Sequence, residues 1–131
     1  MVTLTPEMKE MIAAQQCFVG TVNEDGIPNV APKSTSILSN DSLVFTESTG
    51  GATYANIKKG SGVAVAVVNC DKLDGYRFVG NTSVHESGEL YEQEARMSMK
   101  KGRPKPYAVV VIHIKEIYCL MPGAMAGKKI A

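Results

Sequence analysis

The chain has 131 residues, a length that fits one domain with a single hydrophobic core. Its 14 Lys and Arg residues against 13 Asp and Glu leave a net charge of +1, so no overall field draws it to nucleic acid or to an acidic membrane surface. No apolar run approaches the length that crosses a bilayer, and no basic and apolar leader follows the first Met. We therefore expect one cytoplasmic domain over residues 1–131, with no nucleic-acid or membrane partner.

The first predicted element is an amphipathic helix that begins at Thr5-Pro6. Thr5 suits the N-cap position, and Pro6 suits the first helical position because an amide hydrogen is not needed there. Apolar side chains then recur on one face of the helix, at Met8, Met11 and Ile12. We expect this face to cover a sheet.

Two antiparallel strands are predicted after this helix. Residues 17–22 are strand-like, and an Asn-Glu-Asp-Gly turn leads into an extended run over residues 28–38. Pro28 and Pro32 cannot donate to a ladder, so this run lies at a sheet edge, is bulged, or faces something other than a strand. The polar residues 33–36 indicate either a strand face that opens into a cavity or one that faces solvent.

The stretch over residues 42–68 has the layout of a ligand-binding loop. It reads as an apolar strand, a polar turn that contains Gly50 and Gly51, a short helix, and a second apolar strand. Thr53 is predicted to be the N-cap of the short helix. Backbone amides of a Gly-containing turn that enters a helix suit a phosphate, whereas a flexible turn without a ligand explains the same residues.

The second half of the chain adds two strands, a helix and a tail. Residues 76–85 read as a strand, residues 89–101 as an amphipathic helix, and residues 107–120 as a long β-branched strand. Residues 122–131 form an irregular tail. Six strands with hairpin turns, two amphipathic helices and no β-α-β alternation predict a mainly β fold, a closed antiparallel barrel with helices outside.

The cysteines and the lack of a metal-ligand pattern limit the chemistry that the sequence allows. Cys17, Cys70 and Cys119 are odd in number and far apart, so they form neither a disulfide framework nor a CxxC pair, which favours a reducing cytosol. We expect all three to be buried core thiols. No metal-ligand spacing is present, and no side chain stands out as an acid, base or nucleophile, so we predict no metal site and name no catalytic residue.

Three motifs stand in a characteristic order along the chain. They are Asp-Gly-Ile-Pro-Asn-Val-Ala-Pro-Lys-Ser at 25–34, Thr-x-x-Asn-Ile-Lys-Lys at 53–59 before an apolar strand, and Gly-Tyr-Arg-Phe-Val-Gly at 75–80. In this order they resemble the pyridoxamine phosphate oxidase-like, FMN-binding split-barrel family, from the first helix to the last strand. The resemblance implies a six-stranded antiparallel split barrel that is a homodimer, with two FMN molecules at the subunit interface.

The resemblance also implies which residues hold the FMN. It places Lys33 and Ser34 at the phosphate or the ring, and Thr53 with the amides before it at the phosphate. Asn56 steadies the loop, and Arg77 or its neighbours come from the partner subunit. The implied cofactor-binding residues are Val30, Lys33, Ser34, Thr46, Glu47, Ser48, Thr49, Gly50, Gly51, Ala52, Thr53, Asn56 and Arg77.

The sequence departs from the family pattern at two places. Many relatives carry Lys immediately before the helix-start Thr, where this chain has Ala52, so that phosphate contact is absent or comes from Lys33 or another lysine. The basic loop at 100–105 either reaches a bound anion or only complements a helix end. The chain ends in Ala-Gly-Lys-Lys-Ile-Ala and has no Trp, so we do not expect a true pyridoxamine phosphate oxidase of vitamin B6 synthesis.

Three functions remain open from the sequence. The leading one is an oxidoreductase that uses bound FMN to transfer a hydride or electrons, with a small-molecule or protein redox partner. The second is an FMN electron carrier or flavin sensor without a substrate of its own. The third is a cofactor-free β-barrel binding module, which the near-neutral charge and the eight Phe and Tyr residues disfavour for oligonucleotides. Relatives of this fold that use a deazaflavin or bind haem keep those cofactors open beside FMN.

Overall fold

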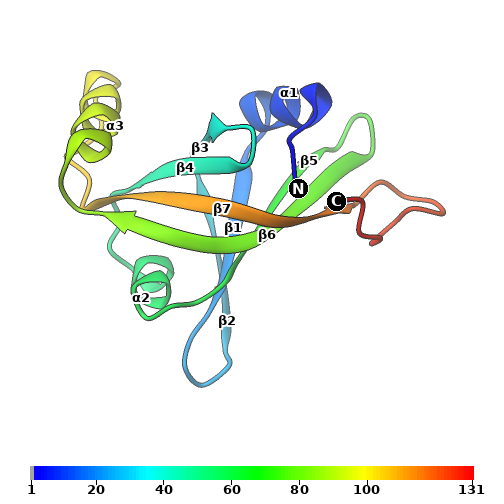
Figure 1. The fold of residues 1–131 in the computed structure, drawn as a ribbon, viewed down its shortest axis with the longest axis horizontal. Coiled ribbons are helices and arrows are strands. Elements are labelled where there is room, and N and C mark those ends of the chain that lie inside the picture. The colour runs from blue at the N-terminus through cyan, green and yellow to red at the C-terminus, as the bar shows by residue number, and fades with distance from the viewer. Residues whose placement is uncertain (1) are drawn as a thin grey trace.

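The computed structural model describes residues 2–131 and contains one seven-stranded sheet (Figure 1). Neighbouring strands run antiparallel throughout, in the order β2-β1-β5-β6-β7-β4-β3. β6 and β7 are the longest strands and form the middle of the sheet. The strands are β1 (Cys17–Val22), β2 (Pro28–Lys33), β3 (Thr35–Ser39), β4 (Ser42–Glu47), β5 (Val63–Asn69), β6 (Asp74–His85) and β7 (Ala108–Cys119).

The two edges of the sheet are strands that follow each other directly in the sequence. β2 ends at Lys33 and β3 begins at Thr35, so only Ser34 separates them. The two Cα steps from Lys33 to Thr35 span about 7 Å at most, so the sheet must curl until these ends of its two edge strands meet. The predicted antiparallel barrel is confirmed, and β2 lies at an edge of the strand order, as its prolines require. The predicted count of six strands is one too low because the run over 28–38 divides at Ser34.

Three helices lie against the sheet (Figure 1). In α1 (Pro6–Ala14), the Thr5 hydroxyl accepts the Met8 amide at 3.2 Å, which confirms the predicted N-cap. α1 packs against β3 and β5 at one end of the barrel. The short α2 (Ala52–Lys58) packs against β1 and β2, whereas α3 (Glu89–Lys100) packs against β7 and β4.

The core of the barrel is a cluster of buried apolar side chains, which includes Val19, Val65 and Phe78. Cys17 and Cys119 are buried, but Cys70 is exposed, so the prediction that all three cysteines are core thiols is wrong for Cys70. The apolar strand already ends at Asn69, and Cys70 falls in the turn that follows. Over residues 2–131, no helix combines the length and the apolar character that crossing a membrane requires.

Candidate functional site

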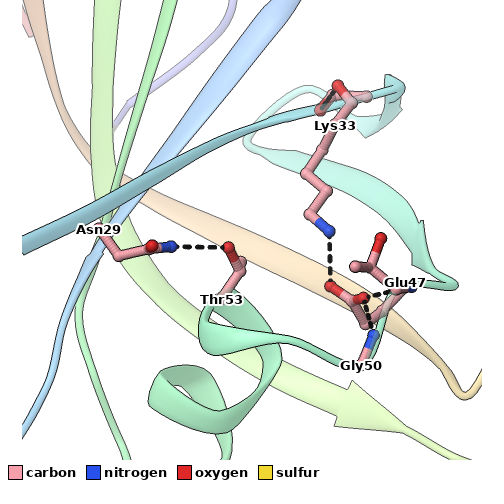
Figure 2. A network of polar contacts seen from close by, with 7 residues as sticks. Asn29, Lys33, Glu47, Gly50 and Thr53 are labelled. Atoms are coloured by element: carbon pink, nitrogen blue, oxygen red, sulfur yellow. Dashed lines mark hydrogen bonds and ion pairs between the residues drawn. The ribbon is translucent and has the colours of Figure 1, made fainter.

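Strand β2 presents Asn29 and Lys33 on one face. The two residues are four positions apart, and strand side chains alternate between faces, so both point to the same side. Figure 2 shows Asn29 directed toward the start of α2 and Lys33 directed toward the end of β4. Val30 points the opposite way and is 68% exposed on the outside of the sheet. The inner face of β2 therefore supplies the polar groups of the site.

A buried ion pair joins β2 to the end of β4. Lys33 Nζ lies 2.8 Å from Glu47 Oε1, and the side chains are 9% and 0% exposed. Glu47 Oε2 also accepts the backbone amides of Thr49 at 2.8 Å and Gly50 at 2.9 Å (Figure 2). One buried carboxylate thus collects a lysine and two loop amides.

The loop between β4 and α2 needs glycine at Gly50. Its φ of +70° lies in the left-handed region, and a Cβ there would stand 3.0 Å from the ring of Tyr107. The Tyr107 amide in turn donates to the Glu47 carbonyl at 2.8 Å. Tyr107 therefore holds the loop from outside while the Glu47 side chain holds it from inside.

The start of α2 differs from the prediction. Gly51, in extended conformation, is the N-cap, and Thr53 lies inside the helix with 4% exposure, so the predicted N-cap at Thr53 is wrong. The helix already begins at Ala52, and the Thr53 hydroxyl instead accepts Asn29 Nδ2 at 3.1 Å (Figure 2). Asn56 Nδ2 donates to the Thr21 hydroxyl at 3.0 Å, which ties α2 to β1.

Backbone amides are available at the first turn of α2. Ala55 is the first residue whose amide donates within the helix, to the Gly51 carbonyl at 3.1 Å. The amides of the three preceding residues lie before the intrahelical ladder begins. Thr49 and Gly50, by contrast, direct their amides to Glu47. Glu47 therefore already occupies the amides of Thr49 and Gly50, whereas the amides at the start of α2 have no partner within the helix that would compete with an anion.

A polar cleft of about 190 Å³ lies on the other face of β4, under α3. Ser34 and Thr46 line it together with Lys101 and Arg103 of the basic loop. The Ser98 hydroxyl also lines the cleft, is buried, and has no hydrogen-bond partner within residues 2–131. The basic loop thus meets Ser34 within one chain, at a cleft where it could reach a bound anion, which is one of the two roles that the sequence left open.

Within the chain, Arg77 lies on the opposite face of the sheet from Lys33, in the row that Pro32, Phe18 and Ala66 form across β2, β1 and β5. It pairs with Ala66 and Tyr118, and its guanidinium carbon lies 4.4 Å from the centre of the Tyr118 ring. A role for Arg77 at the site therefore depends on a second subunit and stays a prediction.

The fold brings most of the remaining predicted residues together. Lys33, Glu47, Thr49 and Gly50 share one set of contacts, and Ser34 and Thr46 share the cleft. The others flank this region: Ser48 is half-buried, whereas Gly51 and Ala52 are exposed. Sequence reasoning missed Asn29 and Ser98. For Asn29 a signal existed, because a residue four positions before Lys33 on a strand shares its face.

The charge of Glu47 depends on its partners. Burial raises the pKa of the Glu47 carboxyl, but the Lys33 ammonium and the amides of Gly50 and Thr49 outweigh burial and hold the pKa below the ordinary value. The carboxylate is therefore ionised at neutral pH, and its interactions favour the folded chain.

Stability is expected to decline in acid partly through Glu47. The carboxyl has a lower pKa in the folded state than in the unfolded one, so its stabilisation is complete above about pH 4.3. It is lost as pH falls through the folded-state pKa, because the unfolded chain takes up the proton first. Urea unfolding of the wild type and Glu47→Gln, followed from neutral to about pH 3, checks this. A wild-type decline that the variant reproduces in full contradicts the assignment.

The similarity to known proteins covers this whole region. A family model described as pyridoxamine 5'-phosphate oxidase matches residues 4–120. The chain belongs to the pyridoxamine 5'-phosphate oxidase family. The protein MJ0282 of Methanocaldococcus jannaschii is 33% identical in an alignment 135 residues long that covers 99% of this chain and 89% of that protein. All strands and helices that build the site lie inside the matched residues.

Solved structures of similar proteins have the same fold. A crystal structure of group A Streptococcus HupZ superposes with a TM-score of 0.85 at 36% identity, covering 95% of this chain and 99% of HupZ. An FMN-binding protein from Syntrophomonas wolfei superposes with a TM-score of 0.69 at 22% identity, covering 86% of this chain and 82% of that protein. The second likeness establishes the fold alone.

Proposed function

We propose that this member of the pyridoxamine 5'-phosphate oxidase family is a homodimeric, FMN-binding oxidoreductase. The observation that carries the proposal is the meeting of β2, the loop of residues 48–51 and the first turn of α2 at one polar site, inside the span that the family model matches. The fold shared with the FMN-binding protein from Syntrophomonas wolfei supports the choice of cofactor.

The residues present fit a phosphorylated flavin. The first-turn amides of α2 precede the intrahelical ladder, and the Asn29 side chain lies beside them through its bond to Thr53. Gly51 has no side chain to block an approach to that turn. When bound, FMN supplies hydride or electron transfer, while the protein binds, orients and sets the electrostatics. The cleft lined by Ser34, Thr46, Lys101 and Arg103 leaves room for a small polar substrate.

A flat apolar row on the outside of the sheet supports dimerisation. Val30, Gly20, Ala64 and Val79 are directly opposite one another across β2, β1, β5 and β6. They line an open hollow of about 640 Å³, and Phe18 beside them is 42% exposed. Small side chains in such a row let a second copy of the sheet approach closely, and burial of this surface favours association.

The proposal predicts a coloured protein. After purification without added cofactor, or after titration with FMN, the visible absorption spectrum is expected to show flavin bands that persist through gel filtration. The expected ratio is one FMN per chain, in a particle with the mass of a dimer. A colourless protein that ignores FMN contradicts the proposal, and retention of haem or a deazaflavin in place of FMN corrects the cofactor.

The same preparation separates an enzyme from a carrier. The flavin is reduced chemically and its reoxidation is followed with a panel of small-molecule acceptors. Rapid reoxidation by one acceptor that saturates with concentration supports an oxidoreductase with its own substrate. Reoxidation only in the presence of a protein partner identifies an electron carrier instead.

A further inference from the structure

Three hydrogen-bond donors at the Lys33 end of the loop have the arrangement of an anion site. They surround the Glu47 carboxylate: the Lys33 ammonium lies 2.8 Å from Oε1, and the amides of Thr49 and Gly50 donate to Oε2 at 2.8 and 2.9 Å. The amides of Thr49 and Gly50 are consecutive and both donate to Glu47 Oε2, as consecutive amides do in backbone nests that bind anions. An ammonium beside such amides is a common way to hold phosphate or carboxylate.

The chain fills this site with its own carboxylate. Glu47 is 0% exposed and takes all three donors, while the Lys33 side chain is 9% exposed. A second anion placed against Lys33 would meet the Glu47 charge at close range in a buried setting, where like charges repel strongly. The Glu47 carboxylate at the end of β4 therefore occupies the position that an anionic group of a bound ligand would take.

We propose that Glu47 is a specificity-determining residue, an internal anion that occupies the Lys33 end of the loop and excludes the anionic groups of ligands from it. Lys33 then does not replace the lysine that this chain lacks at Ala52. A ligand reaching this end of the loop presents a neutral polar group to the Lys33–Glu47 pair. The statement about ligands rests on the proposed flavin site, whereas the internal anion itself does not.

Chemical rescue tests the internal anion directly. Glu47→Ala removes Cγ and the carboxyl group, and acetate has the same atoms, so acetate restores what the substitution deletes. Thermal unfolding of the cofactor-free variant is followed in sodium acetate and in sodium chloride at equal ionic strength. We expect acetate to raise its Tm by about 5 °C or more once the site is saturated. The wild type is expected to show no difference between the two salts.

Two variants control for general salt effects. Lys33→Met/Glu47→Ala lacks the ammonium and is expected to lose the acetate effect. Glu24→Ala removes a carboxylate that also pairs with a lysine at 2.8 Å, Lys59, but on the exposed surface, and is expected to gain no acetate effect. If Glu47→Ala unfolds on purification, its refolding yield in acetate against chloride gives the same readout. A variant that ignores acetate in both measurements overturns the proposal.

Flavin-binding measurements test whether Glu47 excludes the ligand phosphate from Lys33. The ratio of the riboflavin and FMN dissociation constants reports what the ligand phosphate contributes. Lys33→Met/Glu47→Gln removes both charges, and we expect it to change this ratio by less than about twofold. A tenfold fall in this ratio means that the FMN phosphate binds Lys33, and it overturns the proposal that Glu47 excludes the phosphate. If the wild type binds neither flavin, the proposed function fails, while the acetate experiment still decides the role of Glu47.

Discussion

A Gly80→Ala variant is expected to be strongly destabilised. A Cβ at this position would lie 2.0 Å from the His113 carbonyl oxygen and 2.8 Å from the carbonyl carbon. Gly80 follows the irregularity at Val79 where the β6–β7 register shifts, so the two backbones approach closely there. Backbone atoms cannot turn aside as a side chain does, so the strands must separate. We expect a cost of roughly 3 kcal/mol or more in the unfolding free energy, measured by urea titration.

Gly62→Ala provides the matched control. The atom nearest to its Cβ would be the Gly80 carbonyl oxygen at 3.8 Å, an ordinary contact distance. We expect its unfolding free energy to stay within about 1 kcal/mol of the wild type. If the two alanine variants are equally stable, the close approach of β6 and β7 at Gly80 is wrong.

Lys33→Met is expected to have a comparable effect for an electrostatic reason. The substitution leaves the Glu47 carboxylate buried with two amide donors and no cation. Removing one partner of a buried ion pair costs about 3–5 kcal/mol. The unfolding free energy at neutral pH, measured in urea, checks this value. At low pH the loss is expected to shrink, because a protonated Glu47 no longer carries the unpaired charge.

Two comparisons identify the cause of that loss. Lys33→Met/Glu47→Gln removes the unpaired charge and keeps an oxygen for the loop amides, so it is expected to recover most of the stability. Lys59→Met breaks the exposed pair with Glu24 and is expected to change little, since water replaces the lost partner. A double variant as unstable as Lys33→Met alone contradicts a role for the buried charge.

Local patterns in the sequence predict most of the fold. Alternating and β-branched residues predict the strands, and Thr5-Pro6 predicts the first helix. The prolines of the run over 28–38 leave an edge strand, a bulge or a face without a neighbouring strand as alternatives, and the structure has the edge strand. No local pattern predicts the break between β2 and β3 at Ser34, because the residues on both sides of Ser34 are extended. Whether a strand divides there is decided by barrel closure, a property of the whole sheet rather than of the neighbouring residues.

The site was harder to predict than the fold because its contacts join distant segments. The resemblance to the family selected Lys33, Glu47 and the loop, but nothing local pairs a lysine with a carboxylate fourteen positions later. The sequence predicts that the Thr53 hydroxyl caps its own helix, whereas in the structure this hydroxyl accepts a hydrogen bond from Asn29 of β2. Side-chain partners at such a site follow from the register of the strands, which composition does not reveal.

The position of the Lys33–Glu47 pair has a consequence for motion. β2 and β4 are far apart in the strand order, so the pair spans the seam at which the curled sheet closes on itself. The Asn29–Thr53 bond joins β2 to α2, which packs on β1 and β2. Transient opening of the barrel along the seam breaks the ion pair and separates Glu47 from the side of the barrel that carries α2. If the proposed flavin site between β2 and α2 is correct, its ligand binds the closed barrel, and we expect added FMN to slow hydrogen exchange in β2.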